Sequence, residues 1–229
     1  MRIAEIIEYI SIIFWILPPF RQYKERYFYY FLILALSDPL ALFSVTVLGF
    51  SPNYIHPVAG LLLFYSINTS LANLKKYWLL HGILISVFFF VLLYFDNLLY
   101  IVFIMHLLIL FKFIHIIIIE MFNSTSLNAF NLALSFYEIS VVINLTLFLS
   151  DIQIRFVMFY MTLFFQILLA IFFTIFTEKS DFLILKLRSD NWNFQLRILQ
   201  ILRISFLDNY LTLKKIISTC TNDFLIKMN

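Results

Sequence analysis

The sequence predicts an all-α integral membrane protein, a bundle of seven transmembrane helices followed by a short cytoplasmic tail. The first observation is composition: 63% of the 229 residues are hydrophobic and 13% are charged. An ordinary soluble domain has roughly 25% charged residues. A soluble fold cannot bury so much apolar surface, so we expect the lipid bilayer as solvent and partner. The single cysteine, Cys220, excludes an intrachain disulfide and a cysteine-cluster metal site.

The second observation is a series of seven apolar segments, each near the ~20 residues that a helix needs to cross the hydrocarbon. They cover residues 4–20, 27–50, 55–74, 78–95, 98–119, 127–150 and 155–176, so the predicted membrane domain is 1–176. The first segment is short and carries Glu5 and Glu8, and the third is rich in serine and asparagine. The acids in the first segment and the lack of a small-residue cleavage site argue against a signal peptide. Because the connections are short, successive helices should be antiparallel neighbours.

The third observation is the distribution of lysine and arginine. Thirteen of the sixteen basic residues fall in the connections 21–26 and 75–76 or in the tail, which all lie on one side of the predicted bundle. Arg2 and Arg155 fall on the opposite side, and Lys112 lies within the fifth segment. Basic connections stay in the cytoplasm. We therefore predict a multi-pass protein of the plasma or inner membrane, with its N-terminus outside and its C-terminus inside.

The tail, residues 177–229, has a different pattern. Hydrophobic and polar residues alternate over 183–188 and again over 192–198, which predicts a hairpin. Hydrophobic residues then recur every three or four positions over 199–217, as on an amphipathic helix. We expect a small hairpin, an amphipathic helix or both; a solvated, partly ordered tail is the alternative. The tail is the expected contact for a cytoplasmic or membrane protein partner, and no nucleic-acid partner is predicted.

Four polar side chains fall at a similar depth in the predicted bundle. Counted at 1.5 Å per residue, Asp38, Glu138, Gln166 and His106 lie ~15–21 Å from the cytoplasmic ends of their helices. Each would be costly against lipid, so we expect them to point inward and to satisfy one another. They predict a ligand site or pathway for a proton, a cation or a small polar solute. The alternative is purely structural hydrogen bonding between helices. Pro39 directly follows Asp38 and predicts a kink.

Two histidines form a second candidate site. His81 and His115 each lie five residues inside a charged residue on consecutive antiparallel segments, which gives both a depth of ~7.5 Å. Two histidines at equal depth on neighbouring helices can ligate a haem axially. The alternative is that both are interfacial side chains that reach the headgroups. The sequence predicts no other cofactor and no metal site.

An offset of 100 residues places the first three segments on the last three and Asp38 on Glu138, with the fourth segment as a linker. Sequence identity between the halves is low, but some carriers have this arrangement of parallel repeats. Three functions remain open, in decreasing order of support. Short connections and a basic tail favour a non-enzymatic signal-reception or interaction module. The polar cluster and the offset favour a small-solute or proton-coupled carrier, and the histidine pair alone favours a haem-binding electron-transfer subunit. An enzyme has the least support, since no catalytic motif is present.

Overall fold

The computed structural model describes residues 3–49, 51, 54–69, 71–95, 97–124, 126–150 and 155–186. In this part the chain forms eight α-helices, one short 3₁₀ helix and two short strands. Their bounds are α1 (Ile3–Arg21), α2 (Phe28–Thr46), α3 (Ile55–Asn68), α4 (Leu71–Lys76), α5 (Trp78–Tyr94), α6 (Leu98–Ser124), β1 (Ser126–Asn128), α7 (Ala129–Leu149), α8 (Arg155–Ile175), η2 (Asp181–Leu183) and β2 (Ile184–Lys186). A helix lies in each of the seven apolar segments.

The protein is an all-α membrane protein, as the composition predicts. Among the described residues, four helices are long and apolar enough to cross a membrane: α2, α6, α7 and α8. The part of α1 from Tyr9 to Arg21, α3 and α5 are apolar but shorter. Large apolar side chains cover the outer surface of these helices; Leu93 and Tyr94 of α5, for example, are 77% and 73% exposed. Such a surface suits contact with lipid.

The third predicted segment is not one helix, so a single span over residues 55–74 is wrong. α3 ends at Asn68, Thr69 is extended at φ −129° and ψ 124°, and α4 begins at Leu71. The side chains of Ser66 and Asn68 donate to the carbonyl oxygens of Leu63 (2.7 Å) and Phe64 (3.0 Å). Polar side chains that bond to nearby backbone weaken a helix at its end.

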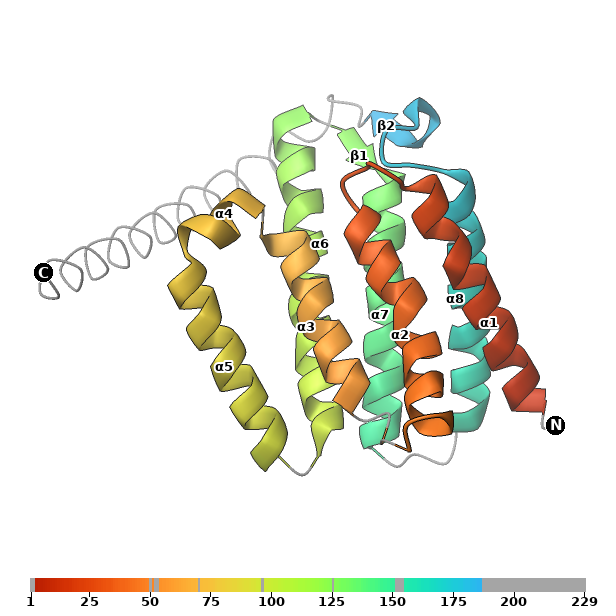
Figure 1. The fold of residues 1–229 in the computed structure, drawn as a ribbon. Helices are drawn as coiled ribbons and strands as arrows, with labels where there is room; N and C mark the ends of the chain where they lie inside the picture. The colour runs from red at the N-terminus through yellow and green to blue at the C-terminus, as the bar shows by residue number, and fades with distance from the viewer. Residues whose placement is uncertain are drawn as a thin grey trace, which may run out of the picture.

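Six of the helices form two layers of three (Figure 1). α1, α2 and α3 form one layer, and α6, α7 and α8 form the other. α3 packs on α6 and α1 packs on α8, which closes the two layers into a ring. α5 stands outside the ring, where Phe88 and Leu92 pack against Leu98 and Ile101 of α6. This is the three-plus-one-plus-three order that the 100-residue offset suggests, with α5 as the linker.

An aromatic core fills the space between the layers. Phe31 of α2, Phe113 of α6, Phe130 of α7 and Phe173 of α8 have no exposed surface. The ring centroids of Phe31 and Phe173 lie 4.9 Å apart, and those of Phe130 and Phe173 lie 5.2 Å apart. Phe31, Phe130 and Phe173 each lie within a turn of a helix end, so this core closes the bundle near the connection between α1 and α2.

That connection also caps the C-terminal end of α8. The Nε2 atom of Gln22 donates to the carbonyl oxygens of Phe173 (3.0 Å) and Phe176 (2.7 Å). The Nε atom of Arg21 donates to the carbonyl oxygen of Ile175 at 3.2 Å. The last carbonyl groups of a helix have no partner within the helix. The end of α1 and the connection to α2 therefore supply the hydrogen-bond donors that the carbonyl groups at the end of α8 lack.

The same end of the bundle holds two ion pairs and the small sheet. Arg26 pairs with Glu178 at 3.1 Å, and Glu25 pairs with Lys179 at 2.8 Å. β1 and β2 pair antiparallel, with Leu127 opposite Leu185. We call this assembly of residues 21–27, β1 and residues 177–186 the latch.

The latch changes the prediction for the start of the tail. A strand does form where alternation begins, and among the described residues it pairs with β1, which lies between α6 and α7. The predicted second strand over 192–198 and the amphipathic helix over 199–217 lie outside the described residues.

Candidate functional site

Glu138 of α7 lies between two partners from other helices. Its Oε2 atom is 2.8 Å from Nδ1 of His106, on α6. The hydroxyl group of Tyr30, on α2, donates to Oε1. Glu138 is completely buried, and Tyr30 and His106 are 1% and 8% exposed. Both carboxyl oxygens therefore have a partner, as a buried polar group requires.

A second series of hydrogen-bonded polar side chains lies two helical turns nearer the latch. Asn131 is seven residues before Glu138 and so lies on the same face of α7. Its Oδ1 atom accepts from the Tyr27 hydroxyl group at 2.9 Å, and its Nδ2 atom donates to Oε1 of Glu120 at 2.6 Å. Tyr27, Tyr30 and Asn131 are not among the site residues predicted from the sequence. The spacing of Tyr27 to Tyr30 and of Asn131 to Glu138 is the signal that points to them.

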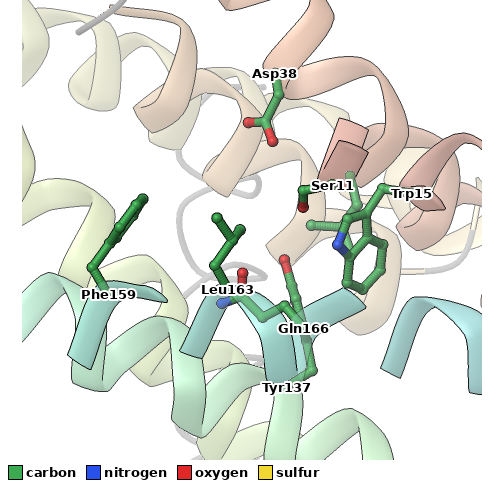
Figure 2. A pocket seen from close by; sticks show the side chains of 8 residues that line it. Ser11, Trp15, Asp38, Tyr137, Phe159, Leu163 and Gln166 are labelled. Atoms are coloured by element: carbon green, nitrogen blue, oxygen red, sulfur yellow. The ribbon is translucent and has the colours of Figure 1, made fainter. Parts of the chain in front are cut away.

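A cavity of about 190 Å³ lies between α1 and α2 of the first layer and α7 and α8 of the second. Its polar lining residues are Ser11, Asp38 and Gln166, and its aromatic ones are Trp15, Tyr137 and Phe159. Leu34 and Leu163 complete the wall. Figure 2 shows the Asp38 carboxylate pointing from α2 into this space, across from the side chains of α8.

Asp38 lies on the inward face of α2, but its side chain is not covered by a neighbouring helix. Leu34, one turn before it, and Ala41, one turn after it, are both buried. The Asp38 side chain itself is exposed, because it faces the cavity and not a neighbouring helix. α2 continues through Pro39 to Thr46. The acid therefore has room beside it for another group.

The opposite wall is held in place by contacts within the second layer and with α1. Nε2 of Gln166 donates to the hydroxyl oxygen of Ser140 at 3.0 Å, and Ser140 donates to the carbonyl oxygen of Tyr137 at 2.7 Å. The rings of Trp15 and Tyr137 lie 4.7 Å apart between centroids, and Trp15 also contacts Phe173 at 6.3 Å. Trp15 is 6% exposed. These contacts fix the shape of the cavity.

The four residues predicted from depth thus form two neighbouring sites. His106 and Glu138 are in direct contact, whereas Asp38 and Gln166 share the cavity. Tyr137 lines the cavity and precedes Glu138 in the chain, so the sites adjoin through α7. Depth places a residue along its helix axis but carries no information on its rotation about that axis. The expected single cluster is divided for this reason.

The two histidines of the haem interpretation have different surroundings. Nδ1 of His81, on α5, is 3.3 Å from the hydroxyl group of Tyr65 on α3. The His115 side chain is exposed on α6. Axial haem ligation by this pair stays a prediction. Across the described ranges, no group of three or more histidine, cysteine, aspartate or glutamate side chains is arranged to hold a metal ion.

Comparisons with protein-family models, with curated proteins and with solved structures find no match to the chain. Its function is therefore argued from the geometry of these sites.

Proposed function

We propose that the protein is a small-solute carrier with seven transmembrane helices, an external N-terminus and a cytoplasmic C-terminus. The observation that carries this proposal is a cavity with polar groups from both sides, at the interface of two three-helix layers. Asp38 comes from the first layer and Gln166 from the second. Carriers built from parallel repeats bind their substrate near the middle of the membrane, at the repeat interface. In this proposal α1, α3 and α5 cross the membrane together with the four longer helices.

The basic residues support the orientation. Seven of them lie in the latch or in α4, at the same end of the bundle in Figure 1: Arg21, Lys24, Arg26, Lys75, Lys76, Lys179 and Lys186. An excess of basic residues marks the cytoplasmic side of a membrane protein. The latch is then cytoplasmic, and the connections at the other end face outward.

The cavity lies nearer the outer end. Phe159 is four residues into α8, ~6 Å from its first residue, and Ser11 is eight residues into α1, ~12 Å from its first residue. On the cytoplasmic side the aromatic core and the latch close the space between the layers. This arrangement suits a carrier that is open outward and closed inward. Tyr27–Asn131 and Tyr30–Glu138 join the layers, and these bonds would have to break for the inner side to open.

Counterflow into liposomes tests the proposal. The full-length protein is reconstituted, and exchange is measured for choline, alanine, glycerol and lactate, which span cationic, zwitterionic, neutral and anionic solutes. We expect exchange of at least one solute above protein-free liposomes. The double variant Asp38→Ala, Gln166→Ala should abolish that exchange, since it removes a polar group from each layer. Asp96→Asn, in the connection between α5 and α6, two helices that do not line the cavity, is the matched control and should exchange normally.

A signal-reception module is the second candidate, and the latch favours it. α1, α2 and α8 line the cavity, and the latch joins the same three helices to the start of the tail. A ligand that moves these helices would therefore move the tail as well. If a solute binds in the cavity but no solute is exchanged in the counterflow assay, the signal-reception module is favoured and the carrier is rejected.

A further inference from the structure

We infer that the ligand of the cavity is a small organic ammonium compound, with one ammonium group on an apolar body of roughly six to nine non-hydrogen atoms. A cavity of about 150 Å³ can hold a six-carbon ring, and this one is about 190 Å³. The inference rests on the proposed function in requiring a solute in the cavity, and it adds the chemical class of that solute.

Charge is the first reason. Of the eight lining residues that the described chain supplies, Asp38 is the one acid, and none is basic. A carboxylate among apolar groups is stabilised by an opposite charge with hydrogen bonds to offer. Ser37 of α2 and His56 of α3 also lie near Asp38, but neither lines the cavity. An ammonium group would donate directly to Asp38, whereas an anionic solute would meet a like charge.

The aromatic wall is the second reason. Trp15, Tyr137 and Phe159 surround the space beside Asp38, and the Trp15 ring is fixed by its contacts with Tyr137 and Phe173. Aromatic faces attract cations, tryptophan most strongly, and the attraction grows where water is excluded. The same rings and Leu34 and Leu163 offer apolar surface to the body of the ligand.

The remaining polar groups fit an ammonium donor. Ser11 and Gln166 each carry an oxygen that can accept a hydrogen bond. An ammonium group has up to three hydrogens to donate, so one carboxylate and two neutral acceptors match it in number. A pocket with one charge, a few polar groups and apolar walls is the usual form of a small-molecule site.

A single-tryptophan variant provides the test. Trp78→Phe and Trp192→Phe leave Trp15, in the cavity wall, as the only indole reporter in the chain. Its fluorescence is titrated, in full-length protein in nanodiscs, with benzylammonium, benzyl alcohol and benzoate, which have nearly the same shape and differ in charge. We expect benzylammonium to bind about tenfold or more tightly than the other two, a ratio equivalent to 1.4 kcal/mol or more.

Asp38→Asn in the same background should remove this preference while benzyl alcohol binding stays within about twofold. The control Asp96→Asn, in the connection between α5 and α6, should keep the preference. Equal binding of the three probes, preference for benzoate, or no response to benzylammonium overturns the ammonium assignment; the wild-type ratio decides this even if Asp38→Asn folds poorly. These results leave the counterflow test of transport unaffected. Ammonium-selective binding without exchange of any solute keeps the inference and overturns the carrier.

Discussion

Two intramembrane acids occupy matching positions in the two layers and have opposite surroundings. Glu138, in α7, is fully buried with a partner on each carboxyl oxygen. Asp38, in α2, lies 100 residues earlier and faces a cavity. A buried acid with all its bonds made contributes to one fixed arrangement of helices. An acid beside an open space has room for a ligand, so in the proposed function Glu138 is a structural acid and Asp38 is the one that binds.

The 100-residue offset shows where this difference originates. The partners of Glu138 are Tyr30 and His106. The residues at the corresponding positions of the other half are Phe130 and Ile6, which offer no side-chain hydrogen bond. Asp38 therefore lacks the pair of partners that its counterpart has.

The largest expected effect is the loss of stability in Glu138→Ala. This change leaves the Tyr30 hydroxyl group and His106 buried without their partner. Each such loss costs about 1–3 kcal/mol in proteins, and less in membrane bundles, where single bonds average ~0.6 kcal/mol. We expect the free energy of unfolding in detergent to fall by about 2 kcal/mol, measured by thermal unfolding followed by circular dichroism.

Asp38→Ala is the control for that measurement, because a group that faces a cavity loses no protein partner of comparable burial. Its free energy of unfolding should change by less than about 0.5 kcal/mol. Equal destabilisation by the two changes would mean that both acids are structural, and the comparison would fail.

Accessibility is the next expected difference. With Cys220 replaced by serine, a cysteine introduced as Asp38→Cys faces the cavity, whereas Glu138→Cys lies in the closed core. We expect a small water-soluble methanethiosulfonate to modify the first at least about tenfold faster, since modification requires access to the thiolate. Mass spectrometry of timed samples gives the two rates. Comparable rates would show that water reaches both positions, contrary to the structure.

Tyr30→Phe should have a smaller effect. This change places phenylalanine at position 30, as at Phe130, the position 100 residues later. It also removes one of the two hydrogen bonds to Glu138. We expect a loss of about 1 kcal/mol, measured as for Glu138→Ala. In the double variant with Glu138→Ala, the loss in free energy of unfolding should be smaller than the sum of the losses in the two single variants, because both changes remove the same bond. Full additivity would mean that the bond contributes nothing.

The sequence was sufficient to locate the helical segments, but not the helix faces that their polar residues occupy. Apolar residues alone distinguish 98–119 as a membrane segment, and α6 begins at Leu98 as predicted. In such a helix hydrophobic residues surround the whole circumference, so the pattern does not say which side faces the core. The predicted cluster contains both His106 and Asp38, but His106 contacts Glu138 whereas Asp38 lines the cavity.

The partners that the sequence did not reveal are of two kinds. Tyr30 and Tyr27 belong to an aromatic-rich segment, where nothing but their hydroxyl groups distinguishes them from the phenylalanines alongside. β1 and β2 are three residues each and lie far apart in the chain, so alternation within residues 183–188 could indicate a strand but not its partner. The break between α3 and α4 depends on side-chain bonds to the backbone, which compete with a helix that the composition favours.

The smallest expected effect belongs to the latch. Arg26→Gln removes an ion pair with Glu178 in which the Arg26 side chain is 50% exposed. Exposed pairs contribute about 0–1 kcal/mol, so the free energy of unfolding should change by less than about 0.5 kcal/mol. Gln22→Ala, in contrast, removes a fully buried amide that donates to two carbonyl oxygens of α8. It should cost about 1 kcal/mol or more.

If Arg26→Gln proved the more damaging change, closure at this end would depend on charge, and stability would then fall as salt is raised. Thermal unfolding of both variants at low and high ionic strength distinguishes the two.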